Sequence, residues 1–304
     1  MQATSKPCRV ALVQMSMDPE PDANMRRAMD RVRAAARAGA QVIALPELFR
    51  TPYFCQREDP SFFDLAEPIP GPTTQALSAL SAELCVVIVA PLFERRAPGL
   101  YHNSLAVLDA DGSLLGVYRK LHIPDDPAFY EKYYFTPGDL GCRVFHTRFG
   151  RIGTLICWDQ WFPETARLTA MAGADVILYP TAIGGHPKDP ASTQSEQLEA
   201  WRAVQRGHAV ANGVYVAAVN RAGFEPCPGG DGLRFWGRSL AFDPFGVPLA
   251  EAAEADETIL FTVDPARIES IRRLWPFWRD RRVDLAPGLA RRWGSGDSGR
   301  PEPG

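Results

Sequence analysis

The chain of 304 residues has no long apolar run, no strong net charge and no recognisable cysteine pairing. No stretch approaches the roughly 18 apolar residues that a helix needs to cross a bilayer. Residues 1–7 are polar and too short for a signal peptide. The formal net charge of −3 argues against nucleic acid or an anionic membrane as the main partner. We therefore expect no nucleic-acid or membrane partner.

The cysteines and histidines are few and scattered. Six cysteines occur without paired spacing, there is no CxxC motif, and the five histidines do not cluster. This pattern indicates reduced thiols in a cytoplasmic protein and no disulfide framework. It also lacks the ligand spacing of a metal site, so we expect no metal.

The chain does have apolar segments, which alternate between strand-like and helix-like patterns. A hydrophobic fraction of 46% provides ample material for a core. The alternation occurs once in each half of the chain, with hairpins beside it, and predicts an α/β fold in four layers, with helices outside two packed sheets. Expected strands are 9–15, 41–45, 86–90, 102–108, 114–120, 152–156, 176–179, 213–220, 235–242 and 258–263; expected helices are 22–38, 73–84, 163–173, 195–211 and 264–275. We expect one domain over residues 1–285 and a loosely ordered tail over 286–304.

Residues 152–179 contain the segment around which we interpret the other candidate site residues. The apolar run 152–156 ends at Cys157, and Pro163 then opens a helix that leads to the next apolar run, 176–179. This is the pattern of a βαβ unit. Cys157 would lie at the carboxyl end of a strand, where open α/β sheets place their chemistry.

Two other reactive residues occupy the same kind of position. Glu47 follows the apolar run 42–46, and Lys120 follows 114–119. If these strands and that of Cys157 are parallel neighbours, their carboxyl ends converge in one pocket. Each residue alone has an ordinary structural explanation, a core thiol or a turn, but three coincident strand ends favour catalysis.

Together the three residues suit nucleophilic attack on a carbonyl or nitrile carbon. Cys157 would be the nucleophile, its thiolate favoured by the nearby cation and the helix N-terminus. Glu47 would act as general base and then as the acid that protonates departing ammonia. Lys120 would stabilise the tetrahedral oxyanion together with the backbone N–H of Trp158.

The segments around these residues resemble the signatures of the nitrilase superfamily, the carbon–nitrogen hydrolases, and the resemblance runs from about Val10 to about Leu285. The strings that carry it are Leu45-Pro46-Glu47, Tyr118-Arg119-Lys120-Leu121-His122, residues 122–127, residues 130–139, Cys157-Trp158-Asp159-Gln160-Trp161 and residues 179–184. The longer strings are similar to members that hydrolyse N-carbamoylputrescine to putrescine, ammonia and CO₂ in polyamine biosynthesis.

The resemblance implies several properties of the chain. It implies an α-β-β-α sandwich whose sheets stack across a homodimer or higher homo-oligomer. It implies the triad Glu47, Lys120 and Cys157, with Glu131 as a second carboxylate that positions it. It also implies that no metal or organic cofactor takes part.

A carbamoyl-amine substrate with a distal ammonium group requires a carboxylate some way from the thiol. Candidates are Asp125, Asp126 and Glu199, although the two aspartates could equally cap turns beside prolines. Tyr130 and Trp158 could line the alkyl chain, or simply fill the core. Departures from the family pattern around Glu199 and over 221–232 leave open a different carbamoyl-amino compound, such as a β-ureido acid, or an omega-amide.

Three other interpretations are weaker. A Cys–His protease using His122 would lack its third partner and leave Glu47 and Lys120 unexplained. The basic aromatic stretch 272–282 is more typical of a subunit interface than of a nucleic-acid site. A non-catalytic interaction module would have no need of the intact triad.

Overall fold

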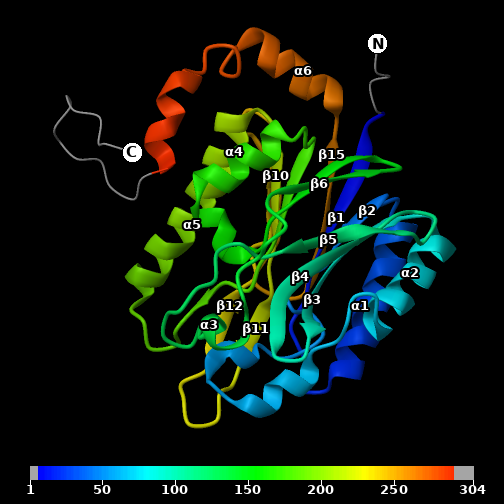
Figure 1. Cartoon of the computed structure of the whole chain (residues 1–304), viewed down its shortest axis with the longest axis vertical. Helices are drawn as coiled ribbons and strands as arrows, with labels where there is room; N and C mark the ends of the chain where they lie inside the picture. The colour runs from blue at the N-terminus through cyan, green and yellow to red at the C-terminus, as the bar shows by residue number, and fades with distance from the viewer. Residues whose placement is uncertain (1–5, 291–304) are drawn as a thin grey trace.

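The computed structural model describes residues 6–290, and its layers are visible in Figure 1. Two six-stranded sheets lie face to face between two pairs of helices, as the sequence predicts. The first sheet has the order β15 (Glu257–Val263), β1 (Cys8–Gln14), β2 (Val42–Ala44), β3 (Val87–Ala97), β4 (Leu100–Leu108) and β5 (Leu114–Arg119). The second has the order β14 (Pro248–Glu251), β13 (Leu240–Phe242), β10 (Tyr215–Val219), β8 (Val176–Pro180), β7 (Gly150–Thr154) and β6 (Arg143–Thr147).

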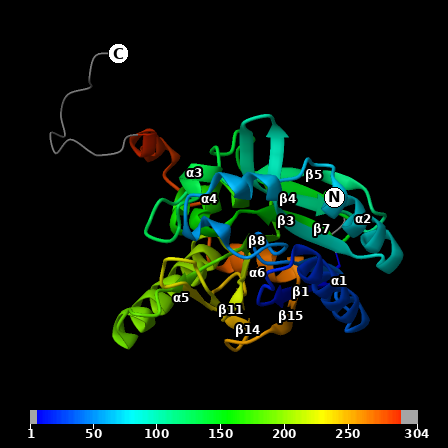
Figure 2. The same cartoon turned by 90° about the horizontal axis from the view of Figure 1, so that it is seen from below.

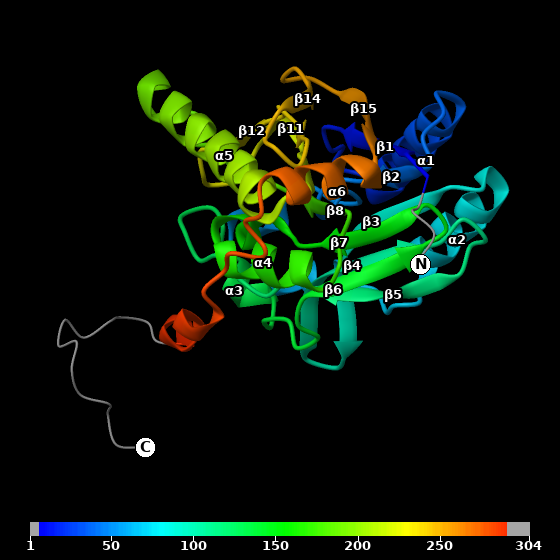
Figure 3. The same cartoon turned by 90° about the horizontal axis from the view of Figure 1, so that it is seen from above.

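Helices cover both outer faces of the sandwich (Figures 1 and 3). The pair α1 (Pro21–Arg37) and α2 (Pro72–Leu84) packs on the first sheet, and α4 (Pro163–Met171) and α5 (Ala191–Asn212) pack on the second. The remaining helical segments are α3 (Glu131–Tyr134), α6 (Pro265–Leu274) and the 3₁₀ turns η1 (Phe54–Gln56), η2 (Pro60–Leu65), η3 (Cys157–Trp161) and η4 (Val283–Ala290).

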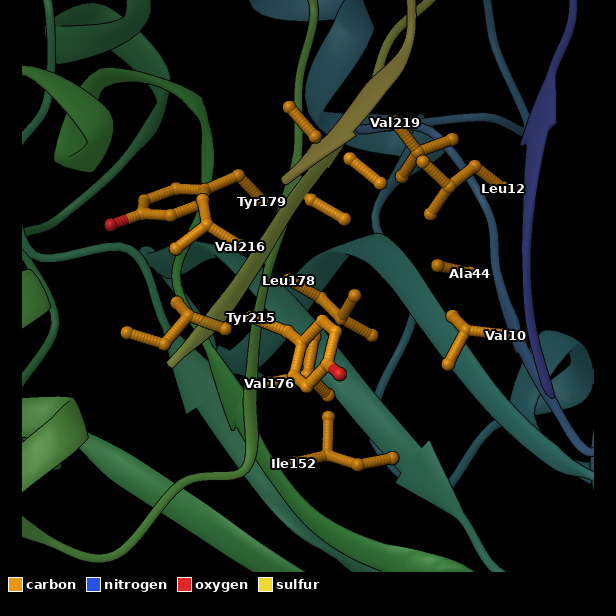
Figure 4. Close-up of a cluster of buried hydrophobic side chains, with 14 of the residues drawn as sticks. Val10, Leu12, Ala44, Ile152, Val176, Leu178, Tyr179, Tyr215, Val216 and Val219 are labelled. Atoms are coloured by element: carbon orange, nitrogen blue, oxygen red, sulfur yellow. The ribbon is translucent and has the colours of Figure 1, made fainter. Parts of the chain in front are cut away.

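The core has two parts because each central strand is buried on both faces. On β1, Val10 and Leu12 point to the second sheet, where Figure 4 shows them across from Val219 and Leu178. The alternate residues of the same strand belong to the cluster under α1 and α2. Such strands read as continuous apolar runs rather than as alternating patterns. Each fully buried Val or Leu contributes about 1.5–3 kcal/mol relative to exposure.

The central βαβ unit forms as predicted. Strands β7 and β8 pair in parallel, with Ile152 opposite Val176, and α4 connects them. The expected arrangement of the reactive strands as neighbours is wrong, however. β2 and β5 lie in the first sheet with β3 and β4 between them, whereas β7 lies in the second. The strand ends meet because the two sheets pack face to face.

Several boundaries differ from the sequence prediction. The expected strand 235–242 is two strands in different sheets, β12 (Leu233–Trp236) and β13, because Gly237 and Arg238 both adopt positive φ and turn the chain. β12 pairs with β11 (Ala222–Glu225) and β9 (Gly184–Gly185) in a third, small sheet, so the segment 221–232 is not only a loop. Helix α5 begins at Ala191, earlier than expected, and β14 has no counterpart in the sequence prediction.

The C-terminal part follows α6 away from the layered body, as Figures 2 and 3 show for η4. η4 crosses the expected domain end near residue 285, so the single-domain assignment stays a prediction. Most of the expected tail, 291–304, lies outside the described residues. Within residues 6–290 no helix has the length and apolar character needed to span a membrane.

Candidate active site

Four reactive side chains meet where the two sheets end. Lys120 Nζ lies 2.8 Å from Glu47 Oε1 and 2.6 Å from Glu131 Oε2. The thiol of Cys157 is close enough to Glu47, Lys120 and Glu131 for the charge of each to shift its pKa. All four residues are buried. The structure therefore brings together the whole predicted catalytic set, including Glu131, which opens α3 in the loop after β5.

Two further side chains hold the carboxylates, and sequence reasoning missed both. Asn103, in the middle of β4, donates from Nδ2 to Glu47 Oε1 at 2.7 Å and to Glu131 Oε2 at 3.5 Å. Tyr53 donates its hydroxyl to Glu131 Oε1 at 2.7 Å. A signal for Asn103 existed, because three polar residues interrupt the otherwise apolar strand at 102–104. Tyr53 lies in an aromatic loop and gives no such signal.

Cys157 occupies a sharp turn. Its φ is +41°, in the left-handed region that costs a non-glycine residue about 1 kcal/mol. The buried Asp159 carboxylate holds this turn by accepting from Ile156 N at 3.0 Å, Tyr118 Oη at 2.6 Å and His122 N at 2.9 Å. Because Tyr118 and His122 flank Lys120, this one carboxylate ties the cysteine turn to the lysine strand.

The surroundings of Cys157 disfavour the expected thiolate. Burial raises the pKa of the Cys157 thiol well above its ordinary value, and Glu47 raises it further, while Lys120 and a backbone hydrogen bond from Ala182 lower it less. The expected helix N-terminus does not help, because Cys157 begins the five-residue turn η3 and α4 starts only at Pro163. The direction of this shift favours the neutral thiol over the thiolate.

The charges around this thiol are set by burial and pairing. Burial by itself lowers the pKa of Lys120, but Glu131 and Glu47 outweigh it, so the pKa lies well above its ordinary value. Burial raises the pKa of Glu131, although Lys120 opposes this shift. Glu47 Oε2 is buried and has no hydrogen-bond partner among the described residues. A carboxylate oxygen that is free to accept a proton is what a general base requires.

A cavity of about 340 Å³ opens onto Cys157 and Glu131. Its walls are aromatic, from Phe129, Trp158, Trp161 and Trp236. Its size and apolar lining are typical of small-molecule sites. Among residues 6–290, no group of three or more histidine, cysteine, aspartate or glutamate side chains could hold a metal ion.

The family model described as carbon-nitrogen hydrolase matches residues 9–273. The chain belongs to this family. The carbon–nitrogen hydrolase is 44% identical to an N-carbamoylputrescine amidase of Solanum lycopersicum, over 91% of this chain and 92% of the relative. It is 39% identical to a citrullinase of Francisella tularensis subsp. tularensis, over 94% of this chain and 99% of that relative. A crystal structure of a carbon-nitrogen hydrolase from Helicobacter pylori G27 superposes with a TM-score of 0.92 at 42% identity, covering 95% of this chain and 100% of that one.

The predicted substrate-binding residues of this carbon–nitrogen hydrolase fall into two groups. Trp158 and Asp126 line the cavity. Asp125 is exposed and does not line it, and Glu199 is exposed on α5 in an ion pair with Arg202. Tyr130 lines a second cavity, of about 380 Å³, on the other side of Pro127.

The cavity also contains residues that the sequence analysis did not select. Asp189 and His186 come from the segment between β9 and α5. The only signal for them was their place in a loop that follows a buried strand end. His122, the alternative protease histidine, faces Asp159 at 2.8 Å and stacks on Phe162 instead of lining the cavity.

Proposed function

We propose that this carbon–nitrogen hydrolase hydrolyses N-carbamoylputrescine to putrescine, ammonia and CO₂. The observation that carries the proposal is the charge of the cavity. Besides Glu131, the carboxylates of Asp126 and Asp189 line the cavity. No arginine or lysine among residues 6–290 lines it.

This distribution of charge favours a cationic substrate over an acidic one. A distal ammonium group is stabilised by carboxylates, whereas a substrate carboxylate would be repelled unless an arginine or lysine faced it. The aromatic walls suit the four-carbon chain between the two ends of N-carbamoylputrescine. The 44% identity to a tomato N-carbamoylputrescine amidase supports the same substrate.

The first half of the reaction forms an adduct on Cys157. Glu47 Oε2 takes the thiol proton while Sγ attacks the carbamoyl carbon, and Lys120 and the backbone N–H of Trp158 stabilise the oxyanion. The bond to the terminal nitrogen then breaks, and Glu47 returns the proton to that nitrogen. Ammonia leaves, and Cys157 Sγ carries the remaining –CO–NH–R group.

The second half releases the amine. Glu47 takes a proton from water as the water oxygen attacks the same carbon, and the C–S bond breaks with return of the proton to sulfur. The product is the carbamic acid R–NH–COOH, which loses CO₂ to give putrescine. Glu131 keeps Lys120 charged throughout, since its carboxylate lies 2.6 Å from Nζ.

A second candidate is a carbamoyl compound or omega-amide that carries an acid group. The 39% identity to a citrullinase favours it, because citrulline bears an α-carboxylate as well as an α-ammonium. His186, which lines the cavity, has a ring N–H that can donate to a substrate carboxylate.

Ammonia release from N-carbamoylputrescine, N-carbamoyl-β-alanine and citrulline decides between these candidates, with Cys157→Ala as the blank. We expect turnover of N-carbamoylputrescine alone. Turnover of either acid in its place would keep the chemistry and overturn the substrate. Asp189→Asn should raise KM for N-carbamoylputrescine at least about tenfold, the loss of one charge-assisted contact, with little change in kcat.

We further infer that the enzyme forms a homodimer or higher homo-oligomer in the cytoplasm. Leu168 and Met171 on α4 are half exposed, and Leu274 and Trp275 at the end of α6 are exposed as well. Exposed apolar surface of this kind is typical of an interface. Six free cysteines support a reducing compartment. Light scattering should give a multiple of 33.5 kDa, and Met171→Glu should lower the mass; a monomeric native protein would contradict the inference.

A further inference from the structure

Arg221 and Glu225 form a buried ion pair that does not line the catalytic cavity. The guanidinium donates to Glu225 Oε1 from Nη2 at 2.7 Å and from Nε at 3.1 Å. Both side chains are buried, at 0% and 4% exposure. Burying two charges costs about as much as their attraction returns, so a pair of this kind is weak evidence for a stabilising role. The other contacts of the pair suggest a different role.

The remaining donors of Arg221 hold the segment that begins at Glu47. Nη1 donates to the carbonyls of Glu47 and Leu48, both at 3.3 Å, and Nη2 donates to Thr51 O at 2.6 Å. Leu48 has a φ of +49°, so this segment is held in a left-handed turn that leucine adopts only with strain. The guanidinium thus fixes the backbone from which the Glu47 carboxylate projects.

The second oxygen of Glu225 extends the contact to the other carboxylate. Oε2 accepts from Tyr53 N at 2.6 Å, and the Tyr53 hydroxyl donates to Glu131 Oε1 at 2.7 Å. The guanidinium also lies over the Tyr53 ring, 5.9 Å from its centroid. One ion pair therefore contacts the backbone of Glu47 directly and orients Glu131 through Tyr53.

The pair also joins the two halves of the fold. Arg221 follows β10 of the second sheet, whereas Glu47 follows β2 of the first. Cys157 extends from the second sheet as well. The distance between nucleophile and base thus depends on how the sheet ends are held together, and Arg221 bridges them.

We propose that Arg221 and Glu225 are positioning residues that preorganise Glu47 and Glu131 against Cys157. This inference rests on the proposed function for the roles of those three residues. It predicts a loss of rate without a matching loss of binding, because a misplacement of about 1 Å can cost about 100-fold in rate.

The test compares two double variants. Arg221→Met with Glu225→Met removes both charges together, which avoids leaving one buried ion unpaired. Arg151→Met with Asp175→Asn is the control, because that pair also contains a buried carboxylate, with Asp175 at 2% and Arg151 at 43% side-chain exposure, and lies at the start of β7 and β8, away from the catalytic ends. We expect kcat to fall about 100-fold in the first variant with KM within about threefold, and kcat to stay within about threefold of wild type in the control.

The single variant Arg221→Lys is a second test should the double variant not fold. Lysine keeps the charge but not the planar fork that reaches three carbonyls, so we expect an intermediate loss in kcat, about tenfold. A folded Arg221→Met/Glu225→Met enzyme with kcat within threefold of wild type overturns the proposal. So does an equal loss in the control.

A readout without substrate separates this proposal from the proposed function. The rate of iodoacetamide alkylation of Cys157 is followed against pH by peptide mass spectrometry. Because Glu47 raises the pKa of Cys157, loss of its position should move the alkylation profile to lower pH. An unchanged profile overturns the positioning role, whether or not N-carbamoylputrescine is hydrolysed; a wild-type enzyme inactive on that compound overturns only the substrate.

Discussion

Lys120 Nζ lies 2.6 Å from Glu131 Oε2, and both side chains are buried. With Glu47 at 2.8 Å on the other side, the ammonium is paired with two carboxylates. One positive and two negative charges leave a net negative site when all three are ionised, and a thiolate would add another negative charge in a place that water does not reach. This arrangement favours a thiol over a thiolate at Cys157, and the thiol proton then needs a nearby acceptor during attack.

Glu47→Gln should abolish most of the activity while leaving the fold intact. The amide keeps the shape and the contacts to Lys120 and Asn103 but cannot accept the thiol proton. General base catalysis contributes typically about 10²–10⁴-fold, so kcat/KM for ammonia release should fall by at least about 100-fold. Circular dichroism should match the wild type. A loss smaller than tenfold would assign the base to another residue.

The alkylation of Cys157 should depend on pH in an unusual way. Because the pKa of the Cys157 thiol is raised well above its ordinary value, the thiolate fraction keeps growing as the pH rises. The iodoacetamide rate constant should still be climbing at pH 9, where free glutathione is already levelling off near its ordinary pKa of about 8.5–9. In Glu47→Gln one source of the shift is gone, so the profile should move to lower pH. A plateau near neutral pH in the wild type would contradict the neutral thiol.

Tyr53→Phe should slow the reaction moderately. It removes only the hydroxyl that donates to Glu131 Oε1 at 2.7 Å. A hydrogen bond to a charged group contributes about 1.5 kcal/mol, which corresponds to roughly tenfold in kcat. Tyr215→Phe, at the start of β10 and away from the catalytic strand ends, is the matched control and should stay within about twofold. Equal effects of the two substitutions would contradict a specific role for Tyr53.

Asp159→Asn should destabilise the protein more than it changes substrate binding. The buried carboxylate accepts from Ile156 N, Tyr118 Oη and His122 N, and an amide NH₂ would face at least one of these donors. An unsatisfied buried donor costs about 1–3 kcal/mol. The midpoint of urea unfolding should fall accordingly with an unchanged slope. Glu83→Gln, which breaks a surface ion pair with Arg33, should leave the midpoint where it is.

The sequence supports much of the fold because its strands are buried on both faces. The runs 42–46 and 152–156 are mostly apolar, and each is followed directly by a reactive residue, so the same pattern indicates both the strand and the site. The predicted strand boundaries were wrong where backbone conformation, and not hydrophobicity, determines the end of a strand. Gly237 and Arg238 take positive φ and divide 235–242 into two strands of different sheets.

The sequence alone determined the family, the α-β-β-α layers and the set Glu47, Lys120, Cys157 and Glu131, because local patterns and long motif strings carry that information. Only the tertiary structure decided how these residues meet. It places them at the ends of two facing sheets, leaves Asp125, Tyr130 and Glu199 outside the cavity, and brings in Asn103, Tyr53, Asp189 and Arg221 from distant positions. It also decided the charge of the thiol, since a pKa depends on burial and on the charges that packing brings near.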